Sequence, residues 1–327
     1  MRAFDYERPS ADADAIRSGR ESSARFIAGG TLLVDLLRLD VERPARVVDL
    51  NGLSHTALEV SANGLRIGAL VRNSDLAEHP QVIAAFPALS QALLSGASPQ
   101  IRNMATVGGN LLQRTRCSYF RDVAVEACNK RTPGSGCAAL TGYSRMHAVL
   151  GVSDRCIAAH PSDMCVALLA LDAVVHTLGP RGERAIPLAD LHTLPGARPE
   201  RESVLEPGEI VTHVSLVKSA LAARSAYVKA RDRASYAFAL ASAAAALELD
   251  GNLVRAARVA LGGVASKPWR CPEVEQALVG KPATKESFQA AAALAMRDAK
   301  TTVDNQFKVE LGRRVIARAL TLAGART

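Results

Sequence analysis

The chain has 327 residues, of which 48% are hydrophobic and 22% charged, and no apolar run approaches the roughly 18 to 20 residues that a membrane span requires. Its formal net charge of +8 would suit nucleic-acid binding, but the charges are spread along the chain, only 4% of residues are aromatic, and no nucleic-acid-binding module is recognisable. We therefore expect no nucleic-acid partner, and we interpret the positive charge as suited to a phosphate-bearing cofactor and to acidic partner subunits. The length favours two domains.

The first part of the chain predicts a strand, a glycine turn and a helix in succession. Residues 25–28 have the composition of a strand, Gly29 and Gly30 allow the positive φ of a tight turn, and residues 32–37 place leucines on one helical face. Such a turn presents free N–H groups to an anion, although an ordinary strand-to-helix turn has the same pattern. The turn lacks the Gly-Lys-Ser/Thr ending of a Walker loop and the third glycine of the dinucleotide fingerprint.

The following elements lead to a segment that is rich in small residues. Residues 45–50 predict a strand beside residues 26–28, and residues 57–71 predict a hairpin that turns at Asn63-Gly64. Residues 74–79 and 82–94 predict two helices. The segment 95–110 has little periodicity, so we interpret it as a binding loop.

The remaining elements suggest a second domain. After the cysteine-rich region, residues 161–173 predict a helix, and two strands follow up to residue 191. Residues 224–265 then predict two or three antiparallel strands. Closing helices are predicted at 272–280, 285–300 and 304–324. We place a domain boundary at about residue 217, which gives domains 1–217 and 218–327.

Five of the six cysteines lie close together in the sequence, at positions 117, 128, 137, 156 and 165. Their spacing contains neither the tight C-x2-4-C pair of structural zinc sites nor the short motif of bacterial ferredoxins. Clustering favours ligation of an iron–sulfur cluster or of zinc, and unligated thiols are the alternative. The intervening residues include Pro133-Gly134-Ser135-Gly136 and show little helical periodicity, so a metal would be a suitable anchor for them.

Other candidate residues carry weaker signals. His147 and His160 lie near the cysteines in the sequence and could join a metal site, but we interpret both as hydrogen-bonded structural residues. Asp163 suits either a cofactor hydroxyl or the cap of the following helix. The sequence contains no G-x-S-x-G and no H-E-x-x-H motif, and no cysteine is placed for nucleophilic catalysis.

Three segments taken together resemble a known family. FIAGGTLLVDLL (26–37), QIRNMATVGGN (100–110) and HPSD (160–163) resemble, in that order, the FAD-binding subunits of the xanthine dehydrogenase family of molybdenum hydroxylases. VALGGVASKPWR (259–270) resembles that family's flavoprotein C-terminal domain, so the likeness covers essentially the whole chain. It implies an α+β fold: a two-part FAD-binding domain of the vanillyl-alcohol-oxidase (PCMH) type, then a domain with a three-stranded antiparallel sheet and helices.

The same resemblance implies an FAD site. The first glycine loop would wrap the FAD diphosphate, and the second would complete the site. Asp163 would bind a ribityl or ribose hydroxyl, and Lys229 would approach the flavin. The implied cofactor-binding residues are Phe26, Ile27, Ala28, Gly29, Gly30, Thr31, Leu32, Leu33, Thr106, Gly109, Asn110, Asp163 and Lys229.

The cysteine-rich insertion, at about 114–158, is similar to an extra loop in the FAD subunits of bacterial periplasmic aldehyde oxidoreductases. That loop holds a [4Fe-4S] cluster, and the matching pieces here are NLLQRTRC, CNKR and PGSGCAAL. The resemblance therefore implies four ligands, with Cys165 left as a buried thiol. The implied ligands are Cys117, Cys128, Cys137 and Cys156. Such a cluster would lie close to the flavin.

The resemblance implies an electron-transfer subunit that does not oxidise aldehyde alone. The expected assembly is a heterotrimer with a large molybdenum-cofactor (Moco) subunit, which converts aldehyde to carboxylic acid, and a small [2Fe-2S] subunit. Electrons would pass to an external acceptor: a quinone, oxygen, a ferredoxin or NAD. The first residues show no secretory signal, so we expect the cytoplasm, or the periplasm if a partner carries the signal. The alternatives are a zinc-stabilised nucleotide-binding or regulatory module without redox activity, and an FAD protein with idle cysteines.

Overall fold

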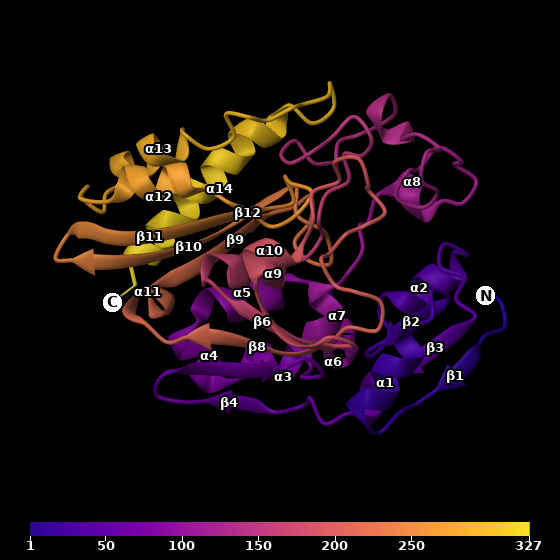
Figure 1. Ribbon diagram of the computed structural model, residues 1–327. Coiled ribbons are helices and arrows are strands. Elements are labelled where there is room, and N and C mark those ends of the chain that lie inside the picture. Colours follow the sequence, from indigo (N-terminus) through magenta and orange to yellow (C-terminus); the bar gives the residue numbers. More distant parts are fainter. Residues whose placement is uncertain (327) are drawn as a thin grey trace.

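The computed structural model describes residues 1–326, which form three sheets with helices packed around them (Figure 1). The first sheet is small and parallel, with the strand order β1-β3-β2. Its strands are β1 (Asp5–Glu7), β2 (Ala24–Ile27) and β3 (Arg46–Asp49). Phe26 pairs with Val48, which confirms the predicted neighbours. The accompanying helices are α1 (Asp12–Gly19), α2 (Leu33–Arg38) and the 3-10 turn η1 (Leu50–Gly52).

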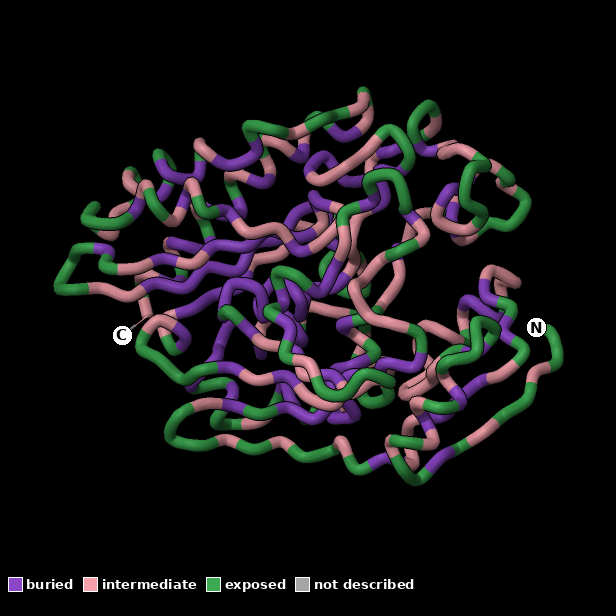
Figure 2. Tube along the Cα trace, in the orientation of Figure 1, coloured by how far each residue is buried: buried purple, intermediate pink, exposed green. Residues whose placement is uncertain are grey.

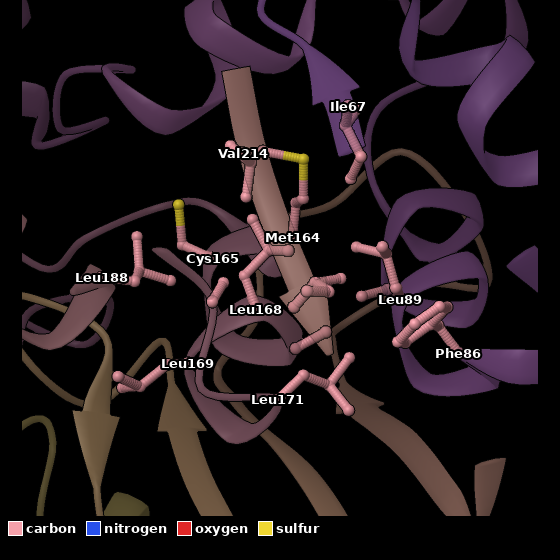
Figure 3. Close-up of a cluster of buried hydrophobic side chains, with 14 of the residues drawn as sticks. Ile67, Phe86, Leu89, Met164, Cys165, Leu168, Leu169, Leu171, Leu188 and Val214 are labelled. Carbon is pink, nitrogen blue, oxygen red and sulfur yellow. The ribbon is translucent and has the colours of Figure 1, made fainter. Parts of the chain in front are cut away.

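The second sheet has five antiparallel strands in the order β4-β5-β8-β6-β7. Its strands are β4 (Leu58–Val60), β5 (Gly64–Gly68), β6 (Val174–Gly179), β7 (Gly182–Pro187) and β8 (Ile210–Val217). The pairing of β4 with β5 confirms the hairpin at Asn63-Gly64. Helix α9 (Asp163–Ala170) lies between this sheet and the next and is buried along its whole length, as Figure 3 shows for Met164 and Leu168.

The third sheet is antiparallel, in the order β12-β11-β10-β9. Its strands are β9 (Ser225–Ala230), β10 (Ala241–Asp250), β11 (Leu253–Gly262) and β12 (Trp269–Arg270). Three long strands confirm the expected sheet, and the two-residue β12 extends its edge. One face packs against α12 (Pro272–Leu278), α13 (Lys285–Ala292) and α14 (Phe307–Gly324), and the other against α5 (Pro87–Ser95) and α9 (Figure 1). Residues 241–247 are consequently all buried.

Two helical predictions need correction. The helix expected at 82–94 is divided at Phe86, because Pro87 has no N–H group and begins a new helix. The segment 95–110 is mostly helical, since Ser98 and Thr106 each cap a short helix by accepting a hydrogen bond from a backbone N–H three residues later. The remaining short helices of this part of the fold are α3 (Asn73–Glu78), α4 (Pro80–Ala85), α6 (Pro99–Met104), α7 (Val107–Leu111), α10 (Leu188–Leu191) and α11 (Ala220–Ala223).

The cysteine-rich insertion is largely irregular. Within 114–158, all of it described, the helical elements are α8 (Ser118–Arg121) and the 3-10 turn η2 (Ala138–Leu140), and there is no strand longer than an isolated bridge. Much of its trace is exposed or half-buried (Figure 2). Phe120 and Cys128 form a small core with Leu36 of α2, and Val149 and Leu150 join the core of the third sheet. Among residues 1–326, no helix has the length and apolar character of a bilayer-spanning segment.

Lys308, in the first turn of α14, is buried with one hydrogen-bond acceptor. It is 0% exposed, and its Nζ atom donates to the carbonyl oxygen of Gly263 at 2.7 Å. Burial, reinforced by the charge of Arg145, lowers the pKa of Lys308 from 10.5 to about 7. The folded chain therefore releases this proton near neutral pH, whereas the unfolded chain holds it up to the ordinary pKa of lysine.

Because the unfolded state binds the extra proton, stability is expected to rise with pH above about 7. Between pH 7 and 9 the free energy of unfolding should increase by about 2 kcal/mol in the wild type relative to Lys308→Met. Urea denaturation of both proteins at the two pH values measures the difference. Equal pH dependence of stability in the two proteins would contradict this expectation.

Candidate functional site

The loop between β2 and α2 presents a row of free backbone donors. Strand β2 ends at Ile27 and α2 begins at Leu33, and within the described structure no hydrogen bond is donated by the N–H groups of residues 29–33. Gly30 has a φ of +71°, and a Cβ atom on Gly29 would lie 1.9 Å from the carbonyl oxygen of Met104. The two glycines thus let this loop turn tightly against α6 with its donors free. Such a row of amides suits a phosphate group.

The second glycine loop, residues 106–110, offers a different surface. The N–H groups of Val107 and Gly108 donate to the carbonyl oxygens of Val71 and Ala69, and that of Gly109 donates to Thr106 Oγ1. Its amides are therefore engaged within the fold, and the glycines allow close approach of a ligand without supplying free donors. The Asn110 side chain accepts a hydrogen bond from Ser162 Oγ at 2.7 Å, which ties this loop to the start of α9.

These two loops line adjoining cavities that share Thr31, Leu32 and Gly109. The first cavity, of about 160 Å³, is bounded by residues 26–33 and Thr106. The second, of about 530 Å³, extends past Asn110 to Asp163 and Lys229. The structure thus brings all thirteen predicted cofactor-binding residues to the walls of these two adjoining cavities, together termed the groove, although they come from four separate segments of the chain. They are Phe26, Ile27, Ala28, Gly29, Gly30, Thr31, Leu32, Leu33, Thr106, Gly109, Asn110, Asp163 and Lys229.

A buried ion pair closes the far end of the groove. The Nζ atom of Lys229, whose side chain is 3% exposed, lies 2.7 Å from Asp163 Oδ2 and 3.0 Å from the carbonyl oxygen of Ser95. The hydroxyl group of Tyr227 donates to Asp163 Oδ1 at 2.5 Å. Ser162, not Asp163, caps α9, so the alternative reading of Asp163 as a helix cap is wrong. Tyr227 was missed because no local motif marks it.

The environment keeps Tyr227 in its neutral form. Burial raises the pKa of Tyr227 well above its ordinary value, and the negative charge of Asp163 and the hydrogen bond to it raise the pKa further. Tyr227 therefore donates a hydrogen bond to Asp163 and keeps its proton. Asp163 thus has one cationic and one neutral hydrogen-bond donor, and both Asp163 and Lys229 line the larger cavity.

Removing the cation of this pair should destabilise the fold. In a Lys229→Met variant, Asp163 keeps only Tyr227 as a donor in a buried position, and we expect a loss of about 3 to 5 kcal/mol in the free energy of unfolding. Urea denaturation measures the loss. Arg231→Met is the matched control, since Arg231 lies two residues along the chain and also donates to the carbonyl oxygen of Ser95. Similar losses in both variants would show that the ion pair has no special role.

The four predicted ligand thiols are neighbours in space. Cys128 and Cys137 face each other across an isolated bridge, and Cys117 immediately precedes α8. Burial raises the pKa of Cys117 to about 12, and the charges of Cys128 and Cys156 raise it further. Burial also raises the pKa of Cys156, to which Cys137 and Cys128 contribute in the same direction. All six cysteines of the chain are free thiols.

The spacing of these thiols differs from that of a single tetrahedral zinc site. Tetrahedral zinc, bound at about 2.3 Å from each sulfur, would require sulfur atoms about 3.8 Å apart. In the described residues, one set of three potential ligand atoms lies within 4.8 Å of one another, and it comprises His160, Cys165 and His192. No three of the four thiol sulfur atoms therefore lie within 4.8 Å of one another. Two basic residues pin the loop: Lys130 donates to the carbonyl oxygen of Pro199 at 2.9 Å, and Arg131 to that of Phe120 at 2.8 Å.

The set formed by His160, Cys165 and His192 belongs to the packing of α9. Cys165 is 0% exposed and lies beside Leu168 and Leu188 in Figure 3, as expected for a buried thiol. Burial raises its pKa to about 12 and lowers the pKa values of both histidines. His192 Nε2 lies 2.9 Å from the carbonyl oxygen of Leu111. The three groups are therefore neutral, and His160 has the structural setting that the sequence predicted.

Comparison with known proteins gives consistent matches over the whole length. Residues 2–216 match the model for the FAD binding domain in molybdopterin dehydrogenase, and residues 225–323 match the CO dehydrogenase flavoprotein C-terminal domain. The aldehyde oxidoreductase FAD-binding subunit PaoB of Escherichia coli (strain K12) is 51% identical over 328 residues, covering 99% of each chain. The carbon monoxide dehydrogenase medium chain of Hydrogenophaga pseudoflava is 27% identical, covering 99% of this chain and 98% of that one.

A solved structure confirms the fold class. A chain of reconstituted CO dehydrogenase from Oligotropha carboxidovorans superposes with a TM-score of 0.77 at 24% identity, covering 100% of this chain and 99% of that one. The matched families, the full-length relatives and the groove agree. The chain therefore belongs to the FAD-binding medium subunits of the molybdenum hydroxylases, within the aldehyde oxidoreductase and xanthine dehydrogenase group of oxidoreductases.

Proposed function

We propose that this chain is the FAD- and [4Fe-4S]-containing electron-transfer subunit of a molybdenum-dependent aldehyde oxidoreductase. The observation that carries the proposal is the single groove that joins the free amides of residues 29–33 to the Asp163–Lys229 pair. An anion-binding end and a charged, buried end suit the two halves of FAD. When bound, the flavin exchanges one or two electrons and an iron–sulfur cluster exchanges one.

Each part of the groove has a distinct role in this proposal. The amides of residues 29–33 bind the diphosphate, since they are free and lie at a turn that glycines keep open. Thr106, Gly109 and Asn110 form a close-fitting wall. Asp163 accepts a hydrogen bond from a ribityl or ribose hydroxyl, and Lys229 holds a positive charge near the isoalloxazine ring, where charge tunes the flavin potential.

The four thiols of the insertion hold the cluster in this proposal. Cys117, Cys128, Cys137 and Cys156 are neighbours, and no three of their sulfur atoms lie as close together as a single zinc ion requires, which supports a polynuclear cluster over zinc. Burial raises the pKa values of Cys117 and Cys156, so free thiolates are disfavoured there until a metal compensates their charge. The insertion has little secondary structure of its own, and ligation would fix it in place.

The partners and substrate follow from the 51% identical relative, which is named as a subunit of an aldehyde oxidoreductase. We infer a heterotrimer in which a large Moco subunit oxidises an aldehyde to a carboxylic acid and a small subunit carries [2Fe-2S] clusters. This chain passes the electrons to an external acceptor. It works in the periplasm if a partner supplies the export signal, and otherwise in the cytoplasm.

Reduction of the flavin by substrate tests this function. In the purified complex, an aromatic or aliphatic aldehyde should bleach the flavin absorption under anaerobic conditions. The isolated chain, loaded with FAD, should remain oxidised in the same mixture, although dithionite should reduce it. Rapid bleaching of the isolated chain by aldehyde would contradict the proposal, as would a complex whose flavin stays oxidised while aldehyde is consumed.

A further inference from the structure

His147 lies inside the cysteine-rich insertion with its ring directed at one of the four thiols. It is 4% exposed, and its Nε2 atom is 3.2 Å from the Sγ atom of Cys117. The ring of Tyr119 packs against it, with the ring centroids 5.9 Å apart. Cys117 and His147 are thirty positions apart in the chain, so their contact results from the fold of the insertion.

The backbone on both sides of His147 is held by the C-terminal domain. The N–H group of His147 donates to the carbonyl oxygen of Ser144 at 2.9 Å. The N–H group of Ser144 in turn donates to Asp304 Oδ2, also at 2.9 Å. On the other side, the N–H group of Val149 donates to the carbonyl oxygen of Val264 at 2.8 Å. These contacts hold the backbone from which the His147 ring reaches Cys117.

The ring nitrogens of His147 differ in their surroundings. The Nδ1 atom is buried and has no hydrogen-bond partner in the described structure, whereas Nε2 faces the sulfur. An imidazole ring carries a proton on at least one of its two nitrogens. A ligand thiolate has no proton to share. The proton of the ring is therefore best placed on Nε2, where it has an acceptor.

We propose that His147 is a positioning residue for the cluster, whose Nε2–H group donates a hydrogen bond to the Sγ atom of Cys117 and raises the reduction potential of the [4Fe-4S] cluster. The inference rests on the proposed cluster. A hydrogen bond to a ligand sulfur stabilises the reduced cluster, which has the greater negative charge, more than the oxidised cluster. His147 thereby favours electron entry into the cluster.

Two near-isosteric variants separate the hydrogen bond from the volume of the side chain. His147→Gln keeps an N–H donor at a similar reach, whereas His147→Met removes it. In an EPR-monitored redox titration of the purified complex, the Met variant should show an about tenfold lower ratio of reduced to oxidised cluster at fixed potential, equivalent to about 59 mV. The Gln variant should titrate close to the wild type, as should His213→Met, which alters a histidine on the five-stranded sheet.

A second readout does not depend on how the variants fold. In wild-type complex labelled with ¹⁵N-histidine, pulsed EPR of the reduced cluster should detect a weak nitrogen coupling, and this coupling should vanish in His147→Gln. A Met variant that retains its iron and titrates as the wild type does would overturn the inference, as would the absence of the nitrogen coupling in the wild type. A wild-type complex without iron in this chain would instead overturn the proposed cluster itself.

Discussion

Replacing Gly29 by alanine should remove FAD from the complex. The added Cβ atom would lie 1.9 Å from the carbonyl oxygen of Met104, a backbone atom that cannot move without shifting α6. The loop between β2 and α2 would have to move away from α6, at a cost of about 1 to 3 kcal/mol. The row of amides at residues 29–33 would then lose its geometry. We expect at least a tenfold loss of FAD per chain, measured by release of the flavin in acid.

Gly182→Ala is the matched control for this substitution. Gly182 is the first residue of β7, where the hairpin returns from β6; its φ is +99°, and a Cβ atom there would meet nothing within 4 Å. That variant bears a strain of about 1 to 2 kcal/mol in a hairpin away from the groove, and it should keep its FAD. Equal FAD contents in the two variants would show that the close approach of Gly29 to Met104 is not needed for binding.

Replacing a single ligand thiol should remove the iron of this chain. In a Cys117→Ala or Cys137→Ala variant the cluster would keep three thiolates in a loop that has almost no secondary structure to hold it. We expect the iron bound by this chain to fall from about four atoms to less than one. The measurement is iron and sulfide analysis of the complex, corrected for the iron of the small subunit by the molybdenum-to-iron ratio.

Cys271→Ala is the control for the thiol variants. Cys271 is 1% exposed, lies in the C-terminal core before α12, and is not one of the four predicted ligands. The Cys271→Ala variant should retain its full iron content even if the core loses some stability. Unchanged iron in the Cys117 and Cys137 variants would remove the cluster assignment and leave the thiols without a metal.

Local patterns predicted most of the individual elements. The strand, turn and helix at residues 25–37 and the hairpin at Asn63-Gly64 depend on residues adjacent in sequence, so composition and periodicity were enough to find them. Pro87 divides a helix whose apolar spacing continues across the break, and the pattern alone therefore suggested one helix. The short helices at 99–111 have too few residues for a period to be visible.

The site depends on contacts between distant segments, which local patterns do not reveal. Lys229 meets Asp163 only because β9 packs beside α5, which in turn packs against α9, and Tyr227 joins them from the same strand. The resemblance to the flavoprotein family suggested Asp163 and Lys229 but not Tyr227. The contact of His147 with Cys117 likewise arises in an irregular loop, where no periodicity predicts which side chains meet.

An iron-edge anomalous diffraction experiment on crystals of the FAD-containing complex tests the central claim most directly. The account predicts FAD density with its diphosphate at residues 29–33 and its ring beside Lys229, and a four-iron peak among Cys117, Cys128, Cys137 and Cys156. Density for FAD elsewhere, or a zinc signal at the thiols with no iron, would contradict it. The second result would favour the zinc-stabilised module instead.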